Sequence, residues 1–341
     1  MTPRERVLKT LQFKEVDRVA FDIMEGNLWG ELFTYFREKY NLLESEEILN
    51  FLDTDIRWTA MTEPTYRPLE EGVYSIEVMK GPLSDARTIS DVKAYRRPDP
   101  SIWESPDCAA VRKKWQNHAL ALLPPWNPLF WTSCVAFGMD EALVKMISEP
   151  KIYNAFIRQH HEFYMTILLN GLKAAKGYCD LCWLGDDYAS QKALLMSPGL
   201  WRRHIKPYLA EQVRLVRDNG MYVIFHSCGA VREILPDLID IGVNALLVFQ
   251  TSAKGMEPGS IASEFGGKLA FYGGVDIQEI LSTGTIEDVR VRVRANVKAF
   301  EKCGGYIVAN AHHGVKTIKP ENVVAMCNTA KKCYSPFKLR K

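Results

Sequence analysis

The 341-residue sequence lacks several features that would assign it to a familiar class of protein. It has no uninterrupted apolar run near the ~18 residues that a membrane span requires, and its first ten residues lack the apolar core of a signal sequence. We therefore expect a cytoplasmic protein that does not enter a membrane. An excess of either charge is also missing, since 43 lysines and arginines face 41 aspartates and glutamates, which makes nucleic acid and anionic membranes poor candidates for a partner.

The eight cysteines lack the dense, regular spacing of a secreted disulfide framework, so reduced thiols are expected. Cys179 and Cys182 are separated by two residues within an apolar segment. Residues three apart in a strand point to opposite faces, so these two thiols are not expected to share a metal. Among the cysteines, the sequence favours a chemical role for Cys228.

What the sequence does contain is a regular alternation of apolar, strand-like segments with segments of helical periodicity. The strand-like segments are residues 119–123, 180–185, 221–226, 244–249, 268–273 and 305–310. Apolar strands that alternate with helices are typical of a parallel sheet covered on both faces. With a further strand at 18–23 and an ambiguous one in the first third, the count approaches eight, and we predict an α/β fold of the (β/α)8 TIM-barrel type.

An open, doubly wound sheet is the competing architecture, but no glycine-rich phosphate loop follows any of these strands. We expect a single domain over residues 1–341. Thr2, Pro3 and Glu5 form a capping-box pattern that predicts an N-terminal helix. Residues 53–118 mix proline-containing stretches with short β-like pieces, and we interpret them as an irregular excursion inserted into the barrel.

Polar residues follow five of the predicted strands at the point where each strand ends. They are Asp186, Asp187 and Gln191 in the first group, then His226 and Cys228, then Gln250, then Asp276, and finally His312 and His313. The carboxyl ends of parallel strands meet at the functional end of such a fold, so we expect these side chains to surround one cavity. Structural alternatives are open for two of them: one of the adjacent aspartates is expected to cap the next helix, and a turn is the alternative role for Asp276.

The spacing of His226 and Cys228 suggests a metal site, because residues two apart in an extended segment point to the same side. Imidazole and thiolate are the usual zinc ligands, and a catalytic zinc takes about three protein ligands and keeps one open position. We expect the third ligand to be His313, with His312 as the alternative. The competing interpretation is a histidine bonded to the backbone beside a small buried thiol.

Several aromatic residues are expected near the mouth of the same cavity and provide apolar walls for a substrate. They are Trp126, Phe130, Trp131, Trp183, Tyr188 and Tyr272. For any single one of them, packing in the core is the alternative.

At this point the sequence resembles a known family. The segments GDDYASQ (185–191), SPGLWRRHIKPYL (197–209), FHSCGAVREILPDLIDIGVNALLVFQ (225–250), FYGGVDIQEIL (271–281) and HHGVKTIKPENVVAM (312–326), with RERVLKTLQFKEVDRV (4–19), resemble the uroporphyrinogen decarboxylase superfamily in sequence and order. The resemblance implies a TIM-type barrel with its cleft at the strand ends. It also implies one of two activities, metal-independent decarboxylation of a porphyrinogen or zinc-dependent methyl transfer with a corrinoid protein.

Two features place the sequence closer to the methyltransferases. The decarboxylases carry an arginine-containing stretch after the first strand, whereas residues 21–27 contain no arginine. The His-x-Cys zinc motif of the methyltransferases matches His226 and Cys228, although their cysteine in the last functional loop is replaced here by His312-His313. One feature points to the decarboxylases: Asp55 matches the aspartate that binds pyrrole N–H groups, with a structural loop acid as the alternative.

We therefore expect a zinc-dependent methyltransferase that exchanges a methyl group between a small methoxyl, methylamine or thiol substrate and a corrinoid (cobalamin). The corrinoid would be carried by a partner protein, because this sequence has no DxHxxG-like cobalamin-binding stretch. Asp187 and Asp276 would orient or protonate the substrate, while Gln191 and Gln250 hold its polar edge. The oligomeric state is open, with a homodimer as one option.

Two alternative functions remain at this stage. The first is a metal-independent decarboxylase of uroporphyrinogen type that uses Asp55 and His313. The second is a non-catalytic barrel that binds a tetrapyrrole or a corrinoid protein.

Overall fold

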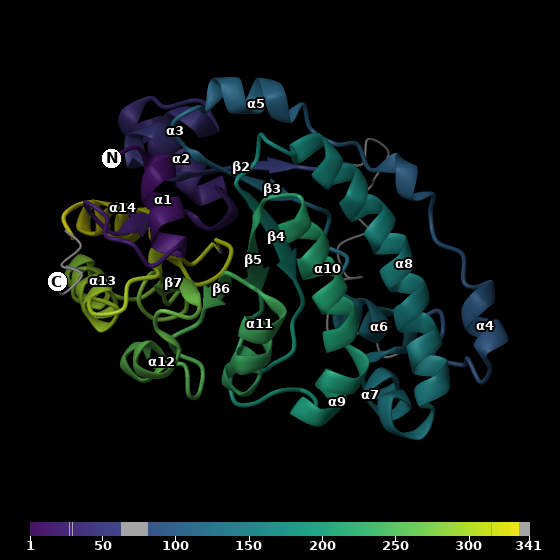
Figure 1. Ribbon diagram of the computed structural model, residues 1–341. Helices are drawn as coiled ribbons and strands as arrows, with labels where there is room; N and C mark the ends of the chain where they lie inside the picture. The colour runs from purple at the N-terminus through teal and green to yellow at the C-terminus, as the bar shows by residue number, and fades with distance from the viewer. Residues whose placement is uncertain (27, 29, 63–80, 315, 334–341) are drawn as a thin grey trace.

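The computed structural model describes residues 1–26, 28, 30–62, 81–314 and 316–333. Eight parallel strands form one sheet in the order β1-β8-β7-β6-β5-β4-β3-β2, so from β2 onward strands that follow one another in sequence are neighbours, and β1 lies beside β8. The strands are β1 (Ala20–Phe21), β2 (Ile56–Ala60), β3 (Ala119–Leu123), β4 (Leu181–Gly185), β5 (Tyr222–His226), β6 (Ala245–Phe249), β7 (Ala270–Val275) and β8 (Tyr306–Asn310). The chain is therefore a (β/α)8 TIM-type barrel, as its alternating apolar segments predict (Figure 1).

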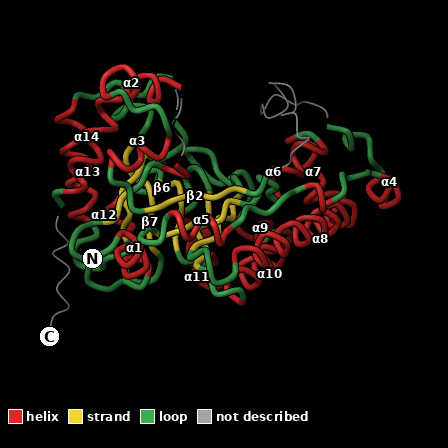
Figure 2. Tube along the Cα trace, turned by 90° about the horizontal axis from the view of Figure 1, so that it is seen from above, coloured by secondary structure: helices red, strands yellow, loops and turns green. Residues whose placement is uncertain are grey.

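Helices surround the strands (Figure 1). They are α1 (Pro3–Leu11), α2 (Gly30–Tyr40), α3 (Ser45–Leu52), α4 (Ile89–Ala94), α5 (Cys108–Lys114), α6 (Leu129–Phe137), α7 (Met139–Ser148), α8 (Pro150–Ala175), α9 (Pro198–His204), α10 (Lys206–Asp218), α11 (Leu235–Ile241), α12 (Pro258–Phe265), α13 (Ile286–Ala299) and α14 (Pro320–Lys331), with short 3-10 turns at η1 (Met24–Gly26), η2 (Pro100–Ile102) and η3 (Arg232–Ile234). Seen from above, α13 and α14 lie on one side of the strands and α8 to α10 on the other (Figure 2). Helices α4, α6 and α7 pack on α8 and extend the molecule on that side.

The stretch 53–118, expected as an excursion from the barrel, contains one of the barrel strands. β2 pairs with β3 from Ile56 to Ala60, so the departure from the barrel begins after Ala60. β2 is not evident from the sequence, because Arg57 interrupts its apolar pattern. In the structure the Arg57 side chain is buried and hydrogen-bonded to Thr54 and Asn50, which makes a charged residue compatible with this position. Within this stretch, residues 63–80 lie outside the described residues, and so do any of the expected β-like pieces that fall there.

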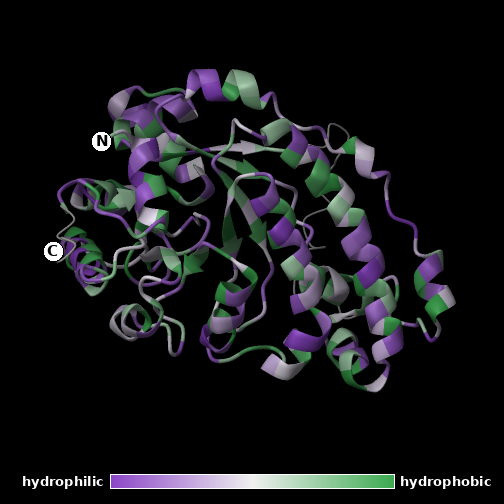
Figure 3. Cartoon of the chain, viewed as in Figure 1, coloured by the Kyte–Doolittle hydropathy of each residue, from purple (hydrophilic) through white to green (hydrophobic). Residues whose placement is uncertain are grey.

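The core has two layers, one inside the barrel and one between the strands and the helices. Inward-facing strand residues such as Ile224 and Ile307 form the inner layer, and Val7 and Leu11 of α1 join it. Helix α1 therefore closes the end of the barrel at which the strands begin. The central strands are largely hydrophobic and the outer helix faces largely hydrophilic (Figure 3). None of the helices in the described part of the chain is long and apolar enough to cross a membrane.

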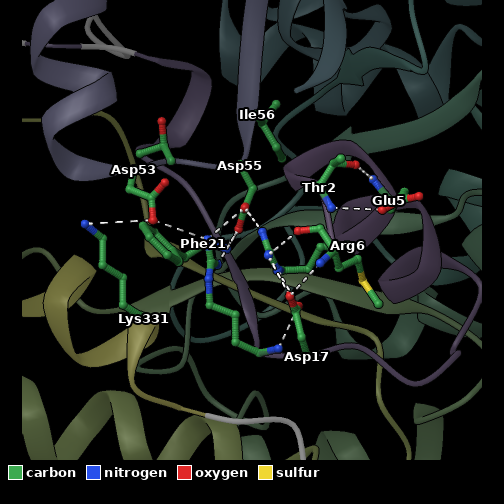
Figure 4. A network of polar contacts seen from close by, with 12 residues as sticks. Thr2, Glu5, Arg6, Asp17, Phe21, Asp53, Asp55, Ile56 and Lys331 are labelled. Carbon is green, nitrogen blue, oxygen red and sulfur yellow. Dashed lines mark hydrogen bonds and ion pairs between the residues drawn. The ribbon is translucent and has the colours of Figure 1, made fainter. Parts of the chain in front are cut away.

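An ion-pair network ties α1 to the start of β2. Asp55 is fully buried, and its carboxylate accepts hydrogen bonds from Arg6 Nη1 at 2.5 Å and Arg18 Nη1 at 2.7 Å. Figure 4 shows Arg6 between Asp17 and Asp55. Asp55 also joins the two edge strands, since its N–H donates to the Phe21 carbonyl at 3.0 Å and its carboxylate accepts from the Phe21 N–H at 2.9 Å. This network connects β1 and β2, which share no strand ladder in the residues described.

Candidate metal centre

Two strand ends bring three potential metal ligands together. His226 is the last residue of β5, Cys228 follows two residues later, and His312 lies two residues beyond the end of β8. One ligand atom from each of the three lies within 4.8 Å of the other two. Cys228 Sγ and His226 Nε2 are 3.7 Å apart. Two nitrogens and a sulfur in this arrangement form a donor set of the kind that zinc prefers.

The loop that carries Cys228 is held by backbone hydrogen bonds to side chains from neighbouring strand ends. The Cys228 N–H donates to Asp187 Oδ1 at 2.9 Å, and the Gly229 N–H donates to Gln250 Oε1 at 3.0 Å. Gly229 has a φ of 83°, and a Cβ placed there would lie 2.4 Å from the Ser190 carbonyl oxygen. Only glycine fits this turn, and the turn fixes the direction of the Cys228 thiol.

The two ring nitrogens of His226 face different groups. Nδ1 lies 3.5 Å from Glu25 Oε1, whereas Nε2 lies on the side of Cys228 and is 3.8 Å from Asp187 Oδ1. The indoles of Trp126 and Trp183 contact the ring edge to face, with centroids 5.5 Å and 5.6 Å away. His226 is thus buried and oriented, with Nε2 turned toward the other two candidate ligands.

His312 and His313 have different contacts, although the centroids of their rings lie at similar distances from that of His226, 6.1 Å and 6.5 Å. His313 was the first choice for the third ligand, but its Nε2 lies 3.0 Å from Glu25 Oε2. The structure places His312, the alternative, in the group with His226 and Cys228. The physical reason is that Glu25, a buried carboxylate that the sequence interpretation did not include, pairs with the neighbouring imidazole.

Burial dominates the electrostatics of the candidate ligands. It raises the pKa of the Cys228 thiol, and the nearby Asp187 carboxylate adds to the effect. Burial also lowers the pKa of His312 to about 4, with a further contribution from the neighbouring imidazoles. A neutral imidazole is the form that binds a metal, and a cation is the group that would compensate a buried thiolate. The residues therefore fit a zinc ion.

Glu25 has unusual electrostatics and an unusual backbone. Burial would raise the pKa of its carboxyl group, but the contacts with His226 and His313 outweigh burial and lower it to about 2. Burial lowers the pKa of His313, and the contact with Glu25 in turn outweighs this and raises it. The backbone of Glu25 is left-handed, with φ 57° and ψ 19°, a conformation that is strained for a glutamate.

A cavity of about 320 Å³ adjoins the candidate ligands, with Cys228 and His312 in its wall. Gln191, Gln250 and Asp276 line it, as the sequence predicts for residues at the strand ends. Asp276 also serves as a turn residue, because its Oδ1 accepts hydrogen bonds from the Gln278 and Glu279 N–H groups at 3.0 Å and 2.7 Å. Of the described residues that line this cavity, none is a lysine or an arginine. A larger cavity of about 630 Å³ lies between α2, α13 and α14 and contains none of the site residues.

The two adjacent aspartates after β4 have different roles. Asp186 is buried and accepts hydrogen bonds from the Phe130 and Trp131 N–H groups at 2.6 Å and 3.0 Å, so it caps the N-terminus of α6. Burial raises its pKa to about 7. Asp187 faces His226 and the Cys228 loop instead. Asp186 therefore caps the earlier helix α6 and not the following one, which the sequence suggested for one of the pair, and Asp187 lies beside the candidate ligands.

Three residues expected to take part in the site do not line the cavity. Tyr188 is fully buried against Phe225 and Trp201 in the outer core and does not line the cavity. Tyr272 is buried inside the barrel, where its hydroxyl donates to Asp22 Oδ2 at 2.5 Å. Asp55 lies at the opposite end of β2, with its oxygens occupied by Arg6, Arg18 and the Phe21 N–H. The residues that contact these three side chains are distant in sequence, so the sequence alone could not identify them. Trp183, by contrast, contacts a candidate ligand.

Sequence reasoning missed two acids in the segment after β1, Asp22 and Glu25. Asp22 is fully buried, and its Oδ2 also accepts a hydrogen bond from Trp58 Nε1 at 2.9 Å. Burial raises its pKa to about 7. The same strand-end rule that identified His226 would have found both acids, had it been applied to the first strand as well as to the later five.

The chain is similar to a protein family and to solved structures. The family model described as uroporphyrinogen decarboxylase (URO-D) matches residues 130–333. Among solved structures, a methyltransferase from Methanosarcina mazei is 16% identical with a TM-score of 0.62, covering 97% of this chain and 99% of the other. A D-psicose 3-epimerase from Clostridium cellulolyticum H10, solved with D-tagatose, is 11% identical with a TM-score of 0.38, covering 84% and 89%. No curated protein matches.

Proposed function

Because the chain belongs to the uroporphyrinogen decarboxylase family, we propose that it is a zinc-dependent methyltransferase that exchanges a methyl group between a small substrate and a corrinoid protein. The observation that carries this proposal is the convergence of His226, Cys228 and His312 at the functional end of the barrel. A structure with the same fold is described as a methyltransferase, which is consistent with the proposal.

The site contains groups suited to this chemistry. Zinc held by the three side chains would act as a Lewis acid, which stabilises a leaving oxygen or lowers the pKa of a substrate thiol. Asp187 holds the Cys228 loop and is a quarter exposed, so it can also orient a substrate or exchange a proton with it. Gln191 and Gln250 offer amide groups to the polar edge of the substrate from the cavity wall.

The size and lining of the cavity favour a small substrate. Its volume of about 320 Å³ is at the low end of the roughly 300–1,000 Å³ typical of ligand pockets. A methoxyl, methylamine or thiol compound fits these dimensions. The corrinoid is proposed to arrive on a separate protein at the mouth of the barrel.

Two observations weigh against the decarboxylase. A porphyrinogen carries several carboxylates, which need guanidinium or ammonium partners when they leave water, and the described lining of the cavity provides none. Asp55, the residue that would bind pyrrole N–H groups, is committed to Arg6 and Arg18 at the other end of the barrel.

The first test is the zinc content of the chain purified without added metal. The wild type is expected to hold about one zinc per chain, and His226→Ala, Cys228→Ser and His312→Ala to lose it. Cys303→Ser is the matched control, because Cys303 is half-buried and lies outside the group, and it should keep the metal. Wild-type protein without zinc, or variants that retain it, would contradict the proposal.

The second test is the reaction itself. Transfer of the methyl group from methylcobalamin to a small thiol, followed through the absorbance of the cobalamin, should require the zinc-loaded wild type. Incubation with uroporphyrinogen should leave its carboxylates intact. Loss of carboxylate without methyl transfer would assign the chain to the decarboxylases instead.

A further inference from the structure

We infer that Glu25 is a positioning residue of the metal centre: it holds His226 with Nε2 free for the metal and keeps His313 out of the ligand set. This inference rests on the proposed zinc site and adds to it a residue from a different part of the chain. The segment after β1 contributes none of the three candidate ligands. The carboxylate of Glu25 in this segment nevertheless contacts the imidazole of one candidate ligand, His226, and that of its neighbour His313.

The geometry of His226 carries the first half of the inference. Its Nδ1 faces Glu25 Oε1 at 3.5 Å, and each of these two buried atoms lacks a hydrogen-bond partner among the residues described. The opposite nitrogen, Nε2, faces Cys228 Sγ at 3.7 Å. A carboxylate beside one nitrogen favours the tautomer that carries its proton there, which leaves the lone pair of Nε2 directed at the metal position.

The position of His313 carries the second half. His312 and His313 are adjacent, so either could have supplied the third ligand. Glu25 Oε2 lies 3.0 Å from His313 Nε2, so this nitrogen of His313 is engaged by the carboxylate, whereas His312 joins the group of candidate ligands. One carboxylate therefore contacts two imidazoles, one through each of its oxygens.

The backbone of Glu25 supports a functional role. A glutamate in the left-handed region is strained, and such strain persists where the surroundings fix it. The next residue, Gly26, also has a positive φ, and a Cβ there would lie 3.3 Å from Trp58. The turn thus places the Glu25 carboxylate in the interior, where only 5% of the side chain is exposed.

The ion-pair partners of Glu25 also support a positioning role. Its ion pairs with described residues are to the imidazoles of His226 and His313, and neither involves a guanidinium or ammonium group. A carboxylate paired in this manner acts on the histidines rather than serving as part of a structural salt bridge. Loss of such an outer partner costs roughly 10–100-fold in metal affinity.

The experiment measures the zinc dissociation constant by competition with a chromophoric chelator at one fixed pH. Glu25→Ala is expected to weaken zinc binding about 10–100-fold, and Glu25→Asp to recover part of the loss. Glu279→Gln is the matched control, because Glu279 is an exposed acid at the same end of the barrel, and its affinity should equal that of the wild type. His312→Ala should abolish binding, whereas His313→Ala should change the constant by less than about threefold.

A measurement on the wild type covers the case in which a Glu25 variant fails to fold. Nitrogen-15 NMR of the histidine rings reports which nitrogen carries the proton, and the zinc-free protein should show His226 protonated at Nδ1. The opposite tautomer would overturn the inference, as would a zinc-binding wild type whose affinity Glu25→Ala leaves unchanged. A wild type that binds no zinc would instead overturn the proposed function itself.

Discussion

At the end of the barrel where the strands begin, the buried carboxylate of Asp55 faces the guanidinium groups of Arg6 and Arg18. At the end where the strands finish, Glu25 is buried almost as completely, but it faces the imidazoles of His226 and His313. Both ends keep a charged group out of water. The first end supplies permanent cations as partners, and the second supplies groups whose charge depends on protons and on metal binding.

This difference separates stability from function within one fold. Guanidinium groups stay charged, so the Asp55 network is suited to holding α1 against the strands wherever the Asp55 carboxylate is ionised. Imidazoles and a thiol can exchange protons and bind a metal, and His226 Nδ1 and Glu25 Oε1 still lack hydrogen-bond partners among the described residues. Incomplete pairing at one end, beside complete pairing at the other, is typical of an active site on a stable scaffold.

The largest expected effect comes from breaking the arginine-paired end. Asp55→Asn leaves two buried guanidinium groups without their carboxylate, which should lower the free energy of unfolding by about 3–5 kcal/mol. Urea denaturation measures the change, and the folded fraction should still bind zinc. A variant of normal stability that loses zinc would place Asp55 in the functional site and contradict the comparison.

The next effect concerns Asp22 at the functional end. Its pKa is raised to about 7 by burial, whereas it is about 4 in an unfolded chain, so between these values the folded state holds a proton that the unfolded state has lost. The free energy of unfolding should therefore fall as pH rises from about 4 to 7. Each unit of pKa difference corresponds to about 1.4 kcal/mol, so the free energy of unfolding should fall by an amount on the order of 2–4 kcal/mol over this pH range. Asp22→Asn should remove this fall.

Urea denaturation of the metal-free protein at several pH values checks the Asp22 prediction. The lowered pKa of His312 produces a slope of opposite sign, which cancels when wild type and variant are compared. Glu25 does not interfere, because its lowered pKa affects stability only as pH falls from about 4.5 toward 2. Parallel curves for wild type and Asp22→Asn would show that Asp22 is ionised in the folded state.

A smaller effect is expected where aromatic rings position the candidate ligands. A Cβ on Gly185 would lie 2.8 Å from Trp126 and 2.9 Å from the Cβ of His226, so Gly185→Ala should displace both. Gly185→Ala should lower the free energy of unfolding by about 1–3 kcal/mol and weaken zinc binding. Gly199→Ala is the control, because the nearest atom to its Cβ would be 3.8 Å away; it should leave zinc binding unchanged and, since Gly199 lies in α9, should raise the free energy of unfolding by up to about 1 kcal/mol. Equal behaviour of the two variants would contradict the role assigned to Gly185.

The smallest effect is expected from an exposed acid beside the Asp55 network. Asp53 is 55% exposed, and its contacts with Arg18 and Lys331 are long, at 3.6 Å and 3.9 Å (Figure 4). Asp53→Asn should change the free energy of unfolding by less than about 1 kcal/mol, since exposed ion pairs contribute little. A loss as large as that of Asp55→Asn would mean that exposure does not distinguish the two acids.

The fold was largely predictable because its strands are continuous apolar runs. The predicted segment 119–123 coincides with β3, and the predicted 305–310 exceeds β8 by one residue. β2 was hidden because its buried Arg57 makes the segment look polar. The partners that make this position acceptable come from the loop and helix before the strand, and a pattern of apolar residues does not record them.

The site was predictable only where it is local. His226 and Cys228 are two residues apart, so their common direction follows from the geometry of an extended chain. The choice between His312 and His313 depends on Glu25, which is more than 280 residues away in sequence and reaches the site only when the barrel forms. The structural alternative for Asp55 depends in the same way on a distant partner, since Arg6 is 49 residues away in sequence.

The join between β1 and β2 has a consequence for how the barrel opens. Every other neighbouring pair of strands is linked by a ladder, whereas this pair is linked through Asp55 and the backbone of Phe21. The barrel is closed at this position by a few hydrogen bonds and not by a continuous strand ladder. These hydrogen bonds hold β1, the strand that leads to Glu25. Amide protons of Phe21 and Asp55 should therefore exchange with solvent sooner than those of β6 or β7, which makes this join the place where the scaffold yields first.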